Sequence, residues 1–131
     1  MRAGPPLRLH WSPDSANLPV RIVLEAFALP HEAVRVDRAG GAHRGPAYRA
    51  LNPQGLIPVL EEDGRALFET GAILLHLADR VGRYGPHGPA IRAPGVRVAV
   101  LKWLFFLSNT VHAEFRIGIH PERLVPEAAA D

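Results

Sequence analysis

The chain of 131 residues contains no cysteine. This absence excludes disulfide bonds, thiolate metal sites and every reaction in which the protein itself supplies a thiol. It removes the dithiol that a disulfide oxidoreductase needs, and it fits a reducing compartment. The seven histidines follow no metal-ligand spacing, so the sequence predicts that the protein holds no metal.

An excess of one charge and a long apolar run are also missing. Fifteen Lys and Arg against 13 Asp and Glu leave a formal net charge of +2, and the two signs are interspersed, so no nucleic-acid surface is predicted. The longest apolar stretch, 96–107, contains Arg97 and Lys102 and is too short to span a bilayer. Residues 1–6 lack the apolar part of a secretory signal. These features predict a soluble cytoplasmic protein without nucleic-acid or membrane partners.

The first third of the chain has the pattern of a strand, a helix and a second strand. Apolar and polar residues alternate over Leu7–Trp11, which predicts a strand. Residues 18–29 have helical apolar spacing and stop at Pro30. Residues 31–37 then read as another strand. This order predicts a parallel strand pair joined by a helical crossover.

The middle of the chain predicts a hairpin followed by a helix. After one or two helical turns in 45–51, the expected elements are a strand, a turn, a strand and a helix, at 57–61, 62–65, 66–68 and 69–81. Asp63-Gly64 is the turn, because both residues accept positive φ. Gly82 is expected to end the helix. A βαβ unit followed by a ββα unit is a thioredoxin-like α/β layout.

Glycines and prolines in 82–95 predict a linker, after which 96–119 has the spacing of one long helix. Aromatic residues occupy much of the circumference of this helix, at Trp103, Phe105, Phe106 and Phe115. A single helix cannot bury that surface alone, so we expect the helix to pack on further elements or on another chain.

The segment Asn52–Leu60 is the most specific pattern, because Glu69-Thr70 follows it at the head of an apolar helix. A proline at the start of a strand marks a turn, an edge or a cis bond. A cis bond at Pro58 would leave the preceding backbone free to pair with an extended, peptide-like ligand. The alternatives are a trans edge proline and an ordinary helix start, for which acidic and hydroxyl residues are also favoured.

Three motifs, 52–55, 57–60 and 67–70, resemble the glutathione-binding signature of the glutathione transferase superfamily. Ser12-Pro13-Asp14-Ser15 and Val20-Arg21 resemble the first loop and helix of its bacterial, beta-like members. The resemblance implies a thioredoxin-like glutathione-binding domain, a linker and the first helix of a truncated all-helical domain, at 1–82, 83–95 and 96–131. Members of the family continue for several more helices and usually form homodimers.

The resemblance also implies roles for five residues. Pro58 matches the cis-proline, and Ile57 or its neighbour Val59 matches the backbone partner of the cysteinyl part of glutathione. Glu69 and Thr70 match the residues that hold the γ-glutamyl end. The chemistry agrees, because the glutamyl ammonium needs a carboxylate, while its carboxylate needs a helix N-terminus and a hydroxyl.

The family activates the glutathione thiol with a hydrogen-bond donor near the start of the first helix, where the helix dipole also favours a thiolate. The candidate donors are Ser12, Ser15 and Asn17, and helix capping is the alternative role for each of them. Alignment on Pro13 favours Ser15, whereas alignment on Arg21 favours Asn17. Ala16 takes the place of the cysteine that bacterial members carry.

His112 is a further catalytic candidate, because 109–115 resembles the segment in which beta-like members carry a histidine facing the sulfur. The alternative is a semi-buried polar residue on a packing helix. Together the resemblances imply a detoxifying transferase that uses glutathione as co-substrate and conjugates it to small, apolar electrophiles. The competing hypothesis is a non-catalytic glutathione-binding or protein-interaction module with the same fold.

Overall fold

The computed structural model describes residues 6–84 and 93–119. The chain divides into two compact units, Met1–Ala93 and Pro94–Asp131. The predicted linker, 83–95, lies largely outside the described residues, so its extent stays a prediction.

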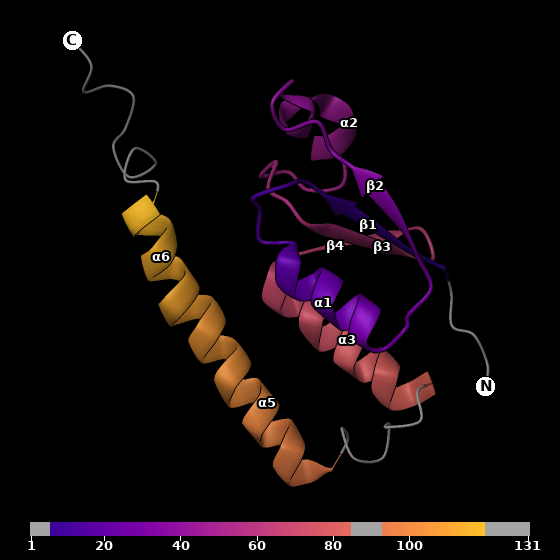
Figure 1. The fold of residues 1–131 in the computed structure, drawn as a ribbon, viewed down its shortest axis with the longest axis vertical. Helices are drawn as coiled ribbons and strands as arrows, with labels where there is room; N and C mark the ends of the chain where they lie inside the picture. Colours follow the sequence, from indigo (N-terminus) through magenta and orange to yellow (C-terminus); the bar gives the residue numbers. More distant parts are fainter. Residues whose placement is uncertain (1–5, 85–92, 120–131) are drawn as a thin grey trace. The chain divides into compact units, whose positions relative to one another are not determined.

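The first unit is built on a four-stranded mixed sheet (Figure 1). Its strands are β1 (Leu7–Trp11), β2 (His31–Arg35), β3 (Val59–Glu62) and β4 (Arg65–Phe68), in the spatial order β2-β1-β3-β4. Strands β1 and β2 are parallel, as predicted, and the other two pairs are antiparallel. The connection between the parallel strands runs through helix α1 (Leu18–Ala26).

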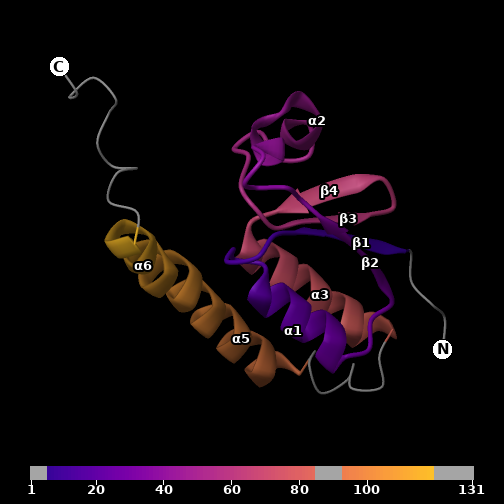
Figure 2. The same ribbon diagram turned by 45° about the horizontal axis from the view of Figure 1, so that its top comes forward.

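Helices α1 and α3 (Thr70–Tyr84) cover one face of the sheet, and α2 (Pro46–Arg49) lies toward the other (Figure 2). The buried residues of the core between the sheet and the two longer helices are all aliphatic: Leu7, Leu9, Val20, Leu24, Leu60, Ile73 and Leu77. On the other face Tyr48 packs with Val36 and Val59. Because side chains alternate along β1 and β3, the sheet carries one hydrophobic cluster on each face.

The hairpin between β3 and β4 confirms the predicted turn. Asp63 and Gly64 have φ values of 52° and 73°. Two successive left-handed residues define a type I′ turn, whose twist matches that of the flanking strands. The turn sets the register in which Val59 pairs with Phe68.

Several element boundaries differ from the predictions. Helix α1 ends at Ala26 and not at Pro30, because Ala28 already turns left-handed with a φ of 47°. Strand β3 starts at Val59, two residues later than predicted.

Helix α3 continues through Gly82 to Tyr84, so the expectation that Gly82 ends it is wrong. Val81 is 2% exposed, and burial of this side chain outweighs the roughly 1 kcal/mol that glycine costs inside a helix. Strand β2 is His31–Arg35 and not 31–37: the Val36 amide still donates to the Trp11 carbonyl at 2.8 Å, but the Asp37 carbonyl accepts from the Ala42 amide of the following loop at 2.9 Å.

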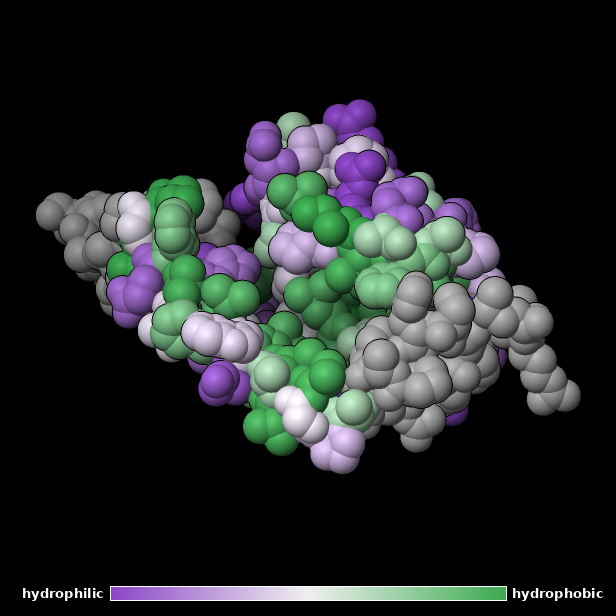
Figure 3. All heavy atoms as spheres, turned by 60° about the horizontal axis from the view of Figure 1, so that its bottom comes forward, coloured by the Kyte–Doolittle hydropathy of each residue, from purple (hydrophilic) through white to green (hydrophobic). Residues whose placement is uncertain are grey.

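The described part of the second unit, 94–119, is one helical segment with an interruption. Helix α5 (Pro94–Phe106) passes into a π-helical turn (Leu107–Val111) and then into α6 (His112–Ile119). The predicted helix over 96–119 is therefore present, but it is not regular throughout. Apolar residues stand on the surface of this part of the chain (Figure 3). The large exposed side chains include Val98, Trp103, Phe105, Leu107, Phe115 and Ile119. Across 6–84 and 93–119, no helix has the length and hydropathy of a membrane span.

Candidate functional site

The sheet register brings the predicted site segments to one end of the first unit. Val59 pairs with His10 on one side and with Phe68 on the other. One residue further along, Pro58 is therefore flanked by the end of β1 and by Glu69. The same end holds the loop before α1, because the Thr70 hydroxyl donates to the Ala16 carbonyl at 3.1 Å.

The Ile57–Pro58 peptide bond is cis, the isomer that the resemblance implies, and Pro58 is buried. Ile57 lies just outside β3, and no backbone–backbone hydrogen bond of the loops in the described residues involves it. Val59 is 0% exposed and sits between two paired strands. Of the two predicted partners for a ligand backbone, Ile57 is thus the one whose N–H and C=O are free to pair.

The loop before the cis bond is closed by its own side chains. The Asn52 side-chain oxygen accepts from the Gln54 amide at 3.0 Å, and the Gly55 amide donates to the Asn52 carbonyl at 2.8 Å. Gly55 has a φ of 64°, and a Cβ there would stand 2.7 Å from the His43 carbonyl oxygen. Only glycine fits this close approach in a left-handed conformation.

Glu69 stands between β4 and α3 in a conformation that non-glycine residues rarely adopt, with a φ of 74°. Its carbonyl accepts the first helical hydrogen bond, from the Ile73 amide at 3.0 Å. Its side chain is exposed, and it joins none of the ion pairs among the described residues. Backbone strain of this kind concentrates at functional sites, and the carboxylate is free to receive a ligand cation.

Thr70 opens α3, whose first N–H groups have no helical partner. Because the Thr70 hydroxyl proton goes to the Ala16 carbonyl, the side chain fastens α3 to the loop before α1. A ligand carboxylate at this position would therefore be bound by the N–H groups of the first turn, and the hydroxyl oxygen retains the ability to accept. The role predicted for Thr70 stays a prediction. In this geometry the N–H groups of the first turn, and not the hydroxyl proton, would bind the ligand carboxylate.

The loop from Ser12 to Asn17 contains a compact hydrogen-bond network. The Asn17 amide nitrogen donates to the Ser12 carbonyl at 2.6 Å and to the Ser15 hydroxyl oxygen at 2.6 Å. The Ser15 hydroxyl donates to the same Ser12 carbonyl at 2.9 Å. Asn17 occupies the N-cap position of α1, yet its side chain makes no capping hydrogen bond. The side chain holds the loop instead.

The network distinguishes the three candidate donors. Ser12 is 3% exposed and Asn17 is 5% exposed, and both amide hydrogens of Asn17 are committed to loop acceptors. Ser15 is only half-buried, and its hydroxyl proton can turn away from the Ser12 carbonyl without leaving that oxygen unpaired. Ser15 is therefore the best placed of the three to donate to a ligand.

His112 is placed apart from these residues along the chain. It begins α6 in the second unit, and its side chain is exposed. Its predicted contact with the sulfur stays a prediction. Among the residues that the structure describes, no group of three His, Cys, Asp or Glu side chains has a geometry suited to a metal ion.

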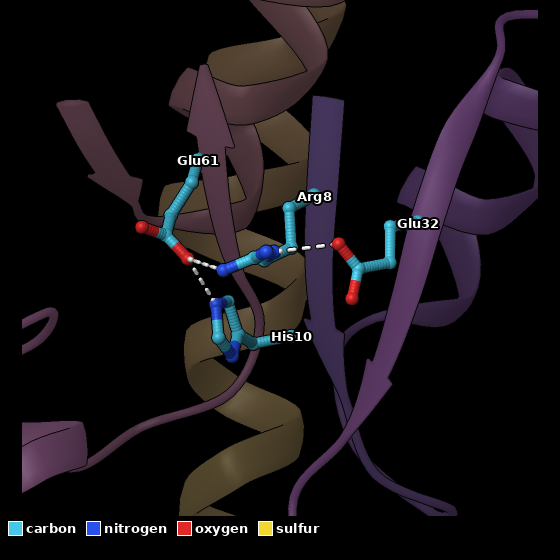
Figure 4. Close-up of polar contacts among 4 residues, drawn as sticks. All are labelled: Arg8, His10, Glu32 and Glu61. Carbon is cyan, nitrogen blue, oxygen red and sulfur yellow. Dashed lines mark hydrogen bonds and ion pairs between the residues drawn. The ribbon is translucent and has the colours of Figure 1, made fainter. Parts of the chain in front are cut away.

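Tyr48 was not predicted as a site residue, but the structure places its hydroxyl against the residue before Ile57. Its hydroxyl donates to the Leu56 carbonyl at 2.9 Å, and its ring meets that of His10 edge to face. His10 belongs to a polar group on the same face of the sheet, with Arg8, Glu32 and Glu61 (Figure 4). The signal in the sequence was weak, because one tyrosine four residues before Asn52 fits any amphipathic turn.

Comparisons with known proteins agree with this geometry. Residues 17–80 match the family model of the N-terminal domain of glutathione S-transferase. Glutathione S-transferase GST-4.5 of Xanthomonas campestris pv. campestris is 32% identical over 110 residues, which cover 84% of this chain and 52% of that protein. Maleylacetoacetate isomerase of Rhizobium meliloti is 45% identical over 70 residues, which cover 53% of this chain and 32% of that protein.

A solved structure of a glutathione transferase homologue from Sulfitobacter, with bound glutathione, has a TM-score of 0.77 at 29% identity. The match covers 98% of this chain and 60% of that one. The chain thus spans roughly a third to a half of the length of the curated relatives above.

The mixed sheet, its two helices and the helical segment that follows define a thioredoxin-like domain joined to a helical region. With the matched domain model and relatives of this kind, the chain belongs to the glutathione transferase superfamily.

Proposed function

We propose that this protein binds glutathione at the end of the sheet where Ile57, Glu69 and Ser15 converge, and that it transfers the thiolate to small, apolar electrophiles. The observation that carries the proposal is the register of Val59 with His10 and Phe68. That register sets an unpaired backbone segment beside an unpaired carboxylate and the first turn of a helix.

The ends of glutathione find complementary groups at this site. The cysteinyl backbone pairs with the N–H and C=O of Ile57 as a short added strand. The glutamyl ammonium is bound by the Glu69 carboxylate, and the glutamyl carboxylate by the N–H groups that open α3 at Thr70. These contacts need no metal, and the Glu69 side chain that would bind the ammonium is exposed.

Ser15 is the donor to the sulfur in this proposal, and Asn17 is its positioning residue. When the Ser15 hydroxyl turns toward the sulfur, its oxygen continues to accept from Asn17, which strengthens the O–H as a donor. The N-terminus of α1 adds a favourable field for the anion. Both effects stabilise the thiolate relative to the thiol and so lower the pKa of the bound glutathione.

The thiolate then forms a carbon–sulfur bond with the electrophile, which expels a leaving anion or takes up a proton from water. Catalysis of this step consists of positioning and a lowered thiol pKa, without a covalent enzyme intermediate. We also propose a homodimer in the cytoplasm, an assembly that would cover part of the exposed apolar surface of α5 and α6. Size-exclusion chromatography with light scattering tests the dimer.

The second candidate function is a glutathione-binding module without transferase activity. One observation favours it: α5 and α6 present large apolar side chains to solvent, as a surface for protein contact does. Conjugation of an aromatic halide distinguishes the two candidates. A rate above that of buffer supports the transferase, whereas binding without turnover supports the module.

Calorimetric titration of the full chain with glutathione tests the binding site. We expect Glu69→Gln to weaken binding by about 10- to 100-fold, because hydrogen bonds to charged groups contribute roughly 1.5–3 kcal/mol. The matched control is Glu114→Gln, which removes an exposed carboxylate from the first turn of α6. Unchanged affinity in Glu69→Gln, or an equal loss in Glu114→Gln, would refute this assignment.

A further inference from the structure

Two side chains hold the carbonyl oxygen of Leu56, the residue before Ile57. The Tyr48 hydroxyl and the Asn52 amide nitrogen each donate to it at 2.9 Å. A carbonyl oxygen has two lone pairs, so the pair of donors uses both of them. The Leu56 carbonyl and the Ile57 N–H belong to one planar peptide unit, and fixing the carbonyl therefore fixes the direction of that N–H.

Tyr48 is held firmly enough to serve as such a support. It is 6% exposed and packs with Val36 and Val59, and short helix α2 presents it to the sheet. Burial raises the pKa of Tyr48 well above its ordinary value, so the hydroxyl keeps its proton and stays a donor at every physiological pH. The aromatic ring has few rotamers to lose, which suits a fixed support.

A polar group on the sheet also contacts the Tyr48 ring. The centroids of the Tyr48 and His10 rings lie 6.1 Å apart at an interplanar angle of 72°. The His10 ring is bonded in turn to the Glu61 carboxylate at 2.5 Å, and Glu61 faces Arg8, which pairs with Glu32 (Figure 4). The ring is thus supported by three adjacent strands, which supply these four residues.

We propose that Tyr48 and Asn52 are positioning residues for ligand binding, which fix the Leu56–Ile57 peptide plane so that the Ile57 N–H meets the cysteinyl carbonyl of glutathione. The proposal rests on the function proposed above. Neither side chain touches the ligand. Their effect is to hold the binding amide in place before the ligand arrives, so that less conformational freedom is lost on binding.

The test compares two variants of the full chain that each lose one hydrogen bond to a backbone carbonyl. Tyr48→Phe keeps the ring and its packing and removes only the hydroxyl. His31→Phe removes the bond from the His31 ring to the Leu29 carbonyl, 2.9 Å long, where β1 and β2 start, at the opposite end of the sheet. Circular dichroism and urea unfolding check that both variants stay folded.

We expect Tyr48→Phe to weaken glutathione binding by about three- to tenfold in calorimetry, with His31→Phe within about twofold of the wild type. If the protein is active, the KM for glutathione rises in Tyr48→Phe while kcat stays nearly constant, because the hydroxyl acts on binding alone. Wild-type affinity in a folded Tyr48→Phe variant overturns the proposal.

A second readout separates this proposal from the proposed function. The ¹⁵N signal of the Ile57 amide, recorded without glutathione, reports on hydrogen bonds to the Leu56 carbonyl. We expect that signal to move or broaden in Tyr48→Phe and to stay in place in His31→Phe. If the wild type binds no glutathione, the proposed function fails, while a moved Ile57 signal still supports the positioning role. An unmoved signal overturns it.

Discussion

The two units of the chain differ in how far they bury their apolar side chains. The first unit closes an aliphatic core between its sheet and the helices α1 and α3, and residues such as Leu60 are 1% exposed. The second unit leaves Trp103 and Phe105 more than half exposed. Every residue of the proposed glutathione contact lies in the first unit. On the proposed function, ligand binding and surface association belong to different parts of this chain, so that they can be altered separately.

The largest contrast concerns stability. We expect Leu60→Ala to lower the free energy of unfolding by about 3 kcal/mol, because it leaves a cavity in a closed core. Phe105→Ala, which removes more atoms from an exposed position, changes it by less than about 0.5 kcal/mol. Urea unfolding followed by circular dichroism measures both values. Equal losses would show that the second unit also has a closed core.

A smaller contrast concerns the sulfur of bound glutathione. We expect Ser15→Ala to raise the thiol pKa by about one unit, because the thiolate loses one hydrogen bond and one unit corresponds to about 1.4 kcal/mol. The control is Thr110→Val, which removes a hydroxyl from the second unit. We expect it to leave the pKa of the glutathione thiol unchanged. Ultraviolet absorbance of the thiolate, titrated against pH, gives the result.

If Asn17→Ala raises the thiol pKa while Ser15→Ala does not, then Asn17 is the donor and the order that we propose for these two residues is reversed. If both raise it, the data fit a donor and its positioning residue.

The smallest contrast replaces an alanine by glycine in each unit and expects opposite effects on stability. Ala28 follows α1 with a φ of 47°, a conformation that glycine adopts freely. We expect Ala28→Gly to stabilise the protein by about 0.5 kcal/mol. Ala99→Gly, in the interior of α5, lowers helix content, since glycine there costs about 1 kcal/mol. Thermal unfolding and circular dichroism measure the two effects, and destabilisation by Ala28→Gly would contradict this account.

Most of the first unit could be predicted because local signals and tertiary packing agree there. Alternation in Leu7–Trp11, the Asp63-Gly64 turn and the helix after Glu69 each have a short-range cause. Gly82 was misjudged because a buried neighbour, Val81, outweighs a local signal that usually ends a helix. The π-helical turn at Leu107–Val111 has no sequence signature that periodicity detects.

The candidate site was predictable as a set of segments but not as a set of roles. The motifs around Pro58 and Glu69 pointed to the end of the sheet at which we propose that glutathione binds. Ser15 and Asn17 could not be separated from the sequence, because both residue types cap helices and form turns. The structure separates them by the burial of Asn17 and by the hydrogen bonds of its amide. Tyr48 was missed because its partner, the Leu56 carbonyl, is a backbone group.

The most direct test of the account is an NMR titration of the ¹⁵N-labelled full chain with S-methylglutathione, which keeps the peptide and lacks the reactive thiol. We predict that the largest amide shifts occur at Ser15, Ile57, Glu69 and Thr70, while signals from α5 and α6 move little. Binding that shifts other regions and leaves the Ile57 and Thr70 amides unmoved would contradict the central claim that glutathione pairs with the backbone before the cis-proline.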